Sequence, residues 1–195
     1  LTLNIRPEKL SGEVTRISPE NHPESTGGAG IIGRPSTSTM PYEQIAAVDL
    51  GSNSFHLEVG RVVYSQIYPL DILKEPVRLA SGLTPEKLLD EASQDRALDT
   101  LSRFSERLRG FQPGAVRAVA TNTLRVAKNA QPFLSKAERV LGFPIEVIAG
   151  REEARLIYLG AAHALPPTRD RRLVVDIGGG STEFIIGKKI EPVIM

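Results

Sequence analysis

From residue 44 onward, the chain alternates between apolar runs with strand-like spacing and longer stretches with helix-like spacing. Short apolar runs bounded by Gly, Pro, Ser or Asn are typical of strands. They predict strands over residues 45–50, 55–64, 70–79, 116–120, 145–149, 173–177 and 182–186. Pro76 lies inside the third run. Because proline cannot donate a hydrogen bond to a sheet, that run predicts an edge strand or a bulge.

Helical periodicity is clearest between Asp90, a good N-cap residue, and Gly110, a good residue to follow a helix C-terminus. The apolar residues at 97, 101, 104 and 108 fall on one face of this predicted helix. Further helices are predicted over 123–128, 132–141 and 152–165, and a linker over 166–172. This order predicts an α/β domain over residues 42–167, followed by the beginning of a second, similar domain over 168–195.

Residues 1–41 have a different composition, since twenty of these positions are Gly, Pro, Ser or Thr and no periodic apolar stripe runs through them. Such a segment buries too little surface to offset the entropy lost on ordering, so it predicts a disordered tail. Met40 directly precedes the first predicted strand. We therefore expect Met40 to be the natural start and the preceding residues to be an upstream segment.

Composition excludes several classes of function. The chain has no cysteine, which excludes a disulfide scaffold, cysteine-ligated metal and thiol catalysis. Its net charge of +1 gives no global attraction to nucleic acid. No apolar run approaches the length of a membrane span, and the beginning of the chain lacks a secretory pattern. We therefore expect a cytoplasmic protein, with peripheral membrane association as the alternative.

The strongest chemical signal is an internal repeat. Residues 47–54, AVDLGSNS, and residues 174–181, VVDIGGGS, both read apolar-Val-Asp-apolar-Gly-x-x-Ser, and a second apolar strand follows each. Each copy therefore predicts a hairpin with a turn of small residues. In such turns, backbone N–H groups and hydroxyls can converge on an anion. The paired residues Asp49 and Asp176 could hold a divalent cation, since hard cations prefer oxygen ligands.

Other phosphate-binding and metal-dependent motifs fit less well. A Walker A loop ending at Gly187-Lys188 would need glycine at 182 and a hydroxyl residue at 189, where the chain has Thr182 and Lys189. A dinucleotide-binding turn would lead into a helix, whereas residues 182–186 are strand-like. The sequence His56-Leu57-Glu58 resembles part of a deaminase motif. Without cysteine ligands, His56 is interpreted as an ordinary strand residue.

Four segments of the chain stand out together: AAVDLGSNSFH (46–56), ATNTLR (120–125), GREEARLIYLG (150–160) and VVDIGGGSTEFIIG (174–187). In this order they resemble the exopolyphosphatase and guanosine pentaphosphate phosphohydrolase family, Ppx/GppA. The resemblance covers about residues 44–195. It implies an actin-like α/β fold, shared with Hsp70 and sugar kinases. It also implies Mg²⁺ as cofactor, inorganic polyphosphate or guanosine pentaphosphate as substrate, and a homodimer at full length.

The resemblance also implies roles for individual residues. Glu153 would be the general base, and Arg125 would contact the terminal phosphates. Asp176 and Glu183 would lie at the magnesium site, with Asp49 supporting it through water. The phosphate loops would comprise Gly51, Ser52, Asn53 and Ser54 in the first copy, and Gly178, Gly179, Gly180, Ser181 and Thr182 in the second. Because neighbouring helical side chains diverge, we expect only one of Glu152 and Glu153 to be buried in the cleft.

Within this family, three features favour an exopolyphosphatase over the guanosine pentaphosphate phosphatase: the Gly-Gly-Gly-Ser turn, Phe111 and Glu191-Pro192. Two other hypotheses stay open. The chain could be an actin-like ATP-binding module, although the GREEAR motif argues against it. It could also be a catalytically silent fragment. Members of the family continue beyond the second loop, so we expect little turnover from these 195 residues alone.

Overall fold

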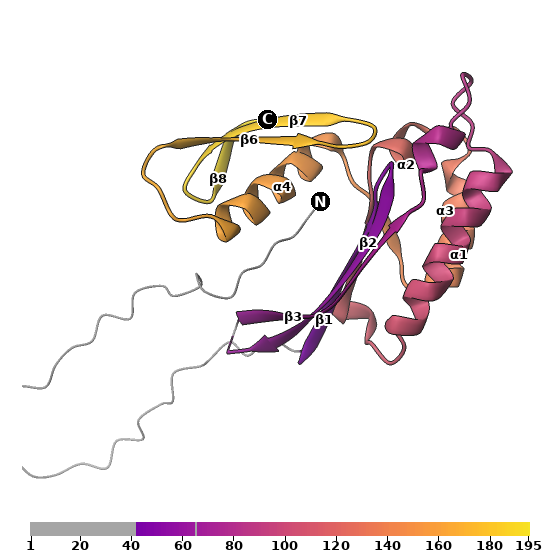
Figure 1. Cartoon of the computed structure of the whole chain (residues 1–195), viewed down its shortest axis with the longest axis horizontal. Coiled ribbons are helices and arrows are strands. Elements are labelled where there is room, and N and C mark those ends of the chain that lie inside the picture. Colours follow the sequence, from indigo (N-terminus) through magenta and orange to yellow (C-terminus); the bar gives the residue numbers. More distant parts are fainter. Residues whose placement is uncertain (1–41, 65) are drawn as a thin grey trace, which may run out of the picture.

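The computed structural model describes residues 42–64 and 66–195, so the predicted tail over 1–41 lies outside the described residues. It contains a five-stranded sheet in the order β3-β2-β1-β4-β5 and a three-stranded sheet in the order β6-β7-β8. The two sheets lie at an angle to each other and approach at one end (Figure 1). The predicted α/β class is confirmed.

The first sheet begins with an antiparallel meander of β1 (Gln44–Leu50), β2 (Ser54–Val63) and β3 (Gln66–Pro76). Strand β4 (Val116–Ala120) then pairs parallel to β1, and β5 (Ile145–Val147) pairs parallel to β4. Alternation along β1 and β2 sends Val48, Leu50, Phe55 and Leu57 to one face, where they are almost completely buried. The other face carries the polar residues between them.

Helices α1 (Glu91–Arg107) and α3 (Ala130–Leu141) cover the apolar face of the first sheet (Figure 1). As predicted, α1 starts after Asp90, whose carboxylate accepts a hydrogen bond from the Ser93 N–H at 2.7 Å. The apolar residues predicted on one face of α1 lie at the centre of the core, and Phe104 is fully buried there. Short helical segments η2 (Leu79–Gly82), η3 (Pro113–Ala115) and α2 (Asn122–Val126) connect the larger elements.

Several predicted boundaries are wrong. The third strand begins at Gln66, four residues earlier than expected, and ends at Pro76, because Leu79 already belongs to η2. Pro76 is tolerated there since β3 is an edge strand, as predicted. The expected linker extends too far, because Arg171 and Arg172 pair with β7 in strand β6. Strand β8 was not predicted at all.

The second sheet comprises β6 (Arg171–Ile177), β7 (Thr182–Lys188) and β8 (Glu191–Ile194). Helix α4 (Gly150–Ala164) packs on one face of it, where Tyr158 is fully buried against Ile185. The opposite face exposes apolar side chains, among them Leu173 and Phe184. Thus α4, which lies within the predicted first domain, packs with the second sheet.

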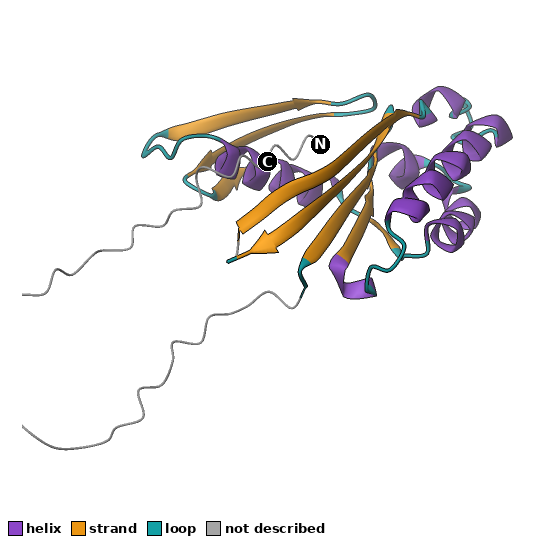
Figure 2. Ribbon diagram, turned by 60° about the horizontal axis from the view of Figure 1, so that its bottom comes forward, coloured by secondary structure: helices purple, strands orange, loops and turns teal. Residues whose placement is uncertain are grey.

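Helix α4 and the second sheet lie on the side of the first sheet opposite to α1 and α3 (Figure 2). The polar face of the first sheet therefore looks toward the second sheet. Within the residues that the structure describes, no helix combines the length and the apolar character needed to cross a membrane.

Candidate active site

The two copies of the repeat form hairpin turns that contact each other. The first turn joins β1 to β2, and the second joins β6 to β7. A Cβ atom placed on Gly179 would lie 2.7 Å from the Asn53 Cβ, and one on Gly180 would lie 2.5 Å from the Ser52 Oγ. These approaches leave no room for a side chain. The glycines of the second turn therefore allow the first turn to pack directly against it.

Hydrogen bonds hold both turns. The Thr123 hydroxyl donates to the buried Ser52 Oγ at 2.7 Å, and the N–H of Ala80 donates to the Ser52 carbonyl at 2.9 Å. The second turn is closed by the Gly178 N–H, which donates to the Ser181 carbonyl at 3.0 Å. Asn122 contacts the second turn, since its side-chain amide donates to the Gly180 carbonyl.

A cavity of about 240 Å³ lies between the turns and is lined mainly by polar atoms. The lining residues are Asp49, Gly51, Ser52, Asn53, Ser54, His56, Lys74, Thr121, Glu153, Asp176, Ile177, Gly178, Gly179, Gly180, Ser181 and Glu183. The structure thus brings together every residue predicted for the site except Arg125 and Thr182, which do not line this cavity. Their predicted roles, like those of the other site residues, stay predictions.

Four carboxylates face this one cavity: Asp49, Glu153, Asp176 and Glu183. Burial raises the pKa of Asp49, and the neighbouring charge of Asp176 raises it further. Burial also raises the pKa of Glu153, with additional contributions from Glu183 and Asp49. Both carboxyl groups therefore hold a proton more tightly than they would in water. A cation placed among them would favour the ionised forms.

Arg125 contacts Glu153 directly. Its guanidinium donates to the Glu153 Oε2 at 3.0 Å and to the Ile148 carbonyl at 2.9 Å. Glu153 is 6% exposed, whereas its neighbour Glu152 points away and forms a two-bond pair with Arg155. That pairing lowers the pKa of Glu152. The expectation that only one of the two glutamates lies in the cleft is confirmed.

The donor set fits a magnesium ion. Within the described residues, no group of three His, Asp or Glu side chains is close enough to form a ready-made metal cage. Mg²⁺ does not need one, because it is usually held by one or two carboxylates together with water and substrate phosphates. Asp49, Asp176 and Glu183 offer such carboxylates beside two turns suited to phosphate.

Sequence reasoning missed two basic residues of the cavity. His56 on β2 pairs with Asp49 on β1, and Lys74 on β3 pairs with His56, so the three side chains form one cross-strand row. Burial and the neighbouring Lys74 lower the pKa of His56. Alternation along β2 was the available signal for His56, because Phe55 and Leu57 point into the core and His56 must point the other way.

Known proteins share this architecture. The sequence profile of the Ppx/GppA phosphatase family matches residues 59–195. An exopolyphosphatase from Cytophaga hutchinsonii has 36% sequence identity and a TM-score of 0.73 over 77% of this chain and 48% of that one. The Ppx/GppA member from Aquifex aeolicus has 30% identity and a TM-score of 0.67, over 77% and 49% of the two chains.

This chain therefore spans about half the length of these solved relatives. The likeness confirms the predicted actin-like α/β fold. It also confirms the resemblance drawn from the four sequence motifs. Because the family profile covers most of the described residues, the chain belongs to the Ppx/GppA phosphatase family.

Proposed function

We propose that the complete protein is a Mg²⁺-dependent phosphohydrolase that releases orthophosphate from the end of inorganic polyphosphate. The observation that carries this proposal is the meeting of two glycine- and serine-rich turns over a cavity lined by four carboxylates. Membership of a phosphatase family and the similarity to an exopolyphosphatase support it. A cytoplasmic location stays a prediction from the sequence pattern, and a homodimer stays a prediction of the family resemblance.

The shape and lining of the cavity favour the end of a phosphate chain. Its volume of about 240 Å³ is below the range of roughly 300–1,000 Å³ typical of sites for drug-sized ligands. Among the described lining residues, the only aromatic ring is the imidazole of His56, so no large ring is present on which a nucleobase could stack. The hydroxyls of Ser52, Ser54 and Ser181 offer donors for phosphate oxygens.

A magnesium ion would be held by Asp176 and Glu183, with Asp49 supporting it through water. When bound, the ion would neutralise charge on the phosphate chain and so allow a nucleophile to approach. The turns would hold the terminal phosphate by backbone N–H groups and hydroxyls from both hairpins. Their direct contact fixes the spacing between these two sets of donors.

Glu153 would act as the general base. Its Oε2 is bound to Arg125, and its Oε1 accepts no hydrogen bond from a described residue, so Oε1 can accept the proton of an attacking water. The water oxygen would bond to the terminal phosphorus as the bridging P–O bond breaks. The products are orthophosphate and a chain shortened by one phosphate. The bond from Arg125 would orient the carboxylate during this step.

The test is Mg²⁺-dependent phosphate release by the complete protein from long polyphosphate, guanosine pentaphosphate and ATP. The variant Glu153→Gln removes the proposed base, and Glu152→Gln is the matched control, because Glu152 faces away from the cavity. We expect release from polyphosphate that needs Mg²⁺, falls by about 10²–10⁴-fold in Glu153→Gln and persists in Glu152→Gln.

Preferential turnover of guanosine pentaphosphate would assign the same site to the other activity of the family. Turnover of ATP alone, with equal rates in both variants, would contradict the proposal. It would support a nucleotide-binding module in which Glu153 has no catalytic role.

A further inference from the structure

The cavity contains an imbalance of charge. Four carboxylates line it, yet among the described lining residues Lys74 is the single permanently cationic side chain. A phosphate chain carries about one negative charge for each phosphate, so its entry into this cavity needs positive charge from the protein as well as from metal. Arg125 does not line the cavity, and its guanidinium donates to the Glu153 carboxylate and the Ile148 carbonyl.

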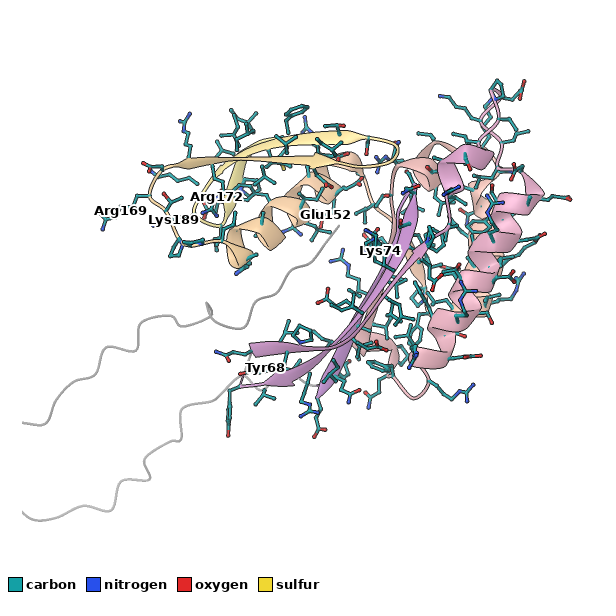
Figure 3. All side chains as sticks on the ribbon, viewed as in Figure 1. Tyr68, Lys74, Glu152, Arg169, Arg172 and Lys189 are labelled. Carbon is teal, nitrogen blue, oxygen red and sulfur yellow. The ribbon has the colours of Figure 1, made fainter. Side chains whose placement is uncertain are left out.

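The register of the first sheet fixes the position of Lys74. Lys74 on edge strand β3 lies opposite His56 on β2, which lies opposite Asp49 on β1. This row crosses the face of the sheet that looks toward the second sheet. Figure 3 shows Lys74 on that side of the strands, toward helix α4.

The charged neighbours of Lys74 in β3 form ion pairs, whereas Lys74 forms none with any described residue. Glu75 and Asp71 point to the other face of the sheet, where they pair with Arg103 and Arg107 of α1 at 3.1 and 3.8 Å. Lys74 forms no ion pair with any residue that the structure describes, and its side chain is exposed. Its ammonium is therefore available to a ligand at no cost in broken ion pairs.

We propose that Lys74 is a phosphate-binding residue of this site and that it contacts non-bridging oxygens of the phosphate chain. This inference rests on the function proposed above. An ammonium group on a flexible stem suits the role, because it can follow a phosphate oxygen without the fixed geometry of a guanidinium. The contact exists both before and during bond cleavage. Lys74 therefore contributes to KM more than to kcat.

The experiment measures binding of inorganic tripolyphosphate by calorimetry, with the complete protein carrying Glu153→Gln so that turnover does not interfere. In this background, Lys74→Met is compared with Lys136→Met, which removes the same charge from an exposed position on α3, on the far side of the sheet. Lys74→Arg tests whether charge alone is enough. Circular dichroism confirms that each variant is folded.

We expect Lys74→Met to weaken binding by about tenfold or more and to flatten its dependence on salt concentration. Lys136→Met should bind like the parent, and Lys74→Arg should recover most of the affinity. With Glu153 restored, Lys74→Met should raise the KM for polyphosphate by a similar factor, with kcat within about twofold of the parent.

Equal affinity of Lys74→Met and Lys136→Met would overturn the inference. If phosphate is still released from polyphosphate in that case, the proposed function stands and only the role of Lys74 fails. If tripolyphosphate binds through Lys74 but nothing is hydrolysed, the role of Lys74 stands and the proposed function fails. A complete protein that neither binds nor hydrolyses phosphate chains would overturn both.

Discussion

Among the glycines of the two turns, Gly180 leaves the least room for a Cβ atom, so a single added methyl group there tests how the site is assembled. In Gly180→Ala, the new Cβ would lie 2.5 Å from the Ser52 Oγ and 2.9 Å from the Asn122 Nδ2. Ordinary van der Waals contacts of a Cβ begin at 3.4 Å. The turns must therefore separate by close to 1 Å, unless the neighbouring side chains can move instead.

Those neighbours have little freedom. The Ser52 hydroxyl accepts the bond from Thr123 in a buried position, and the Asn122 amide donates to the Gly180 carbonyl itself. The backbone of Gly180 is not in the left-handed region, so alanine causes no strain of its own. The methyl group thus acts mainly on the spacing of the two turns. A misplacement of about 1 Å in a catalytic site can cost around 10²-fold in rate.

The assay is Mg²⁺-dependent phosphate release from polyphosphate by the complete protein, reported as kcat/KM. We expect Gly180→Ala to lose about two orders of magnitude while its thermal unfolding stays close to that of the parent, because Gly180 is an exposed turn residue. Gly150→Ala is the matched control, since its Cβ would meet Arg125 no closer than 3.8 Å. Equal activity of the two variants would refute the close contact of the turns.

Three further outcomes follow from the same geometry. Arg125→Gln should lower kcat more than it raises KM, because Arg125 orients Glu153; a change in KM alone, measured by steady-state kinetics, would contradict this. The folded-state pKa of Glu153 is raised above its ordinary value of 4.5, so ionisation weakens the fold as pH rises through the raised pKa. Thermal melts from pH 4 to 8 should therefore show Glu153→Gln gaining stability relative to the parent as pH rises, and a constant difference would argue against burial as the main cause. Tyr158→Ala should lower the free energy of unfolding by about 3–5 kcal/mol in urea titrations, whereas Tyr158→Phe should cost only about 1 kcal/mol.

Elements with strong local signals could be predicted from the sequence. Strand β1 and helix α1 lie where their apolar patterns place them, and Asp90 caps α1 through its own side chain. Strand β8 escaped prediction because it has only four residues and contains Pro192, which is unfavourable inside a sheet. The early start of β3 was missed because Gln66 and Pro69 interrupt its apolar pattern.

The sequence likewise predicts some parts of the candidate site and not others. The two turns were predictable because each is a continuous stretch of sequence and the stretch is repeated. The position of Lys74 at the cavity could not be predicted, because it depends on the register of three strands and on the irregular pairing at Gly60. Likewise, no spacing rule predicts that Arg125 meets Glu153. Their contact arises from the packing of two different helices.

Helix α2 explains how these separate parts become one site. It has only five residues, and Leu124 anchors it in the core of the first sheet. From this fixed position, Thr123 binds the first turn, Asn122 binds the second turn, and Arg125 binds Glu153 on α4. Because α4 and the second turn belong to the unit built on the second sheet, two of these three bonds cross between the units. The position of Glu153 and the contact between the units are therefore coupled through one short helix, and any movement that separates the units must displace Glu153 and the second turn together.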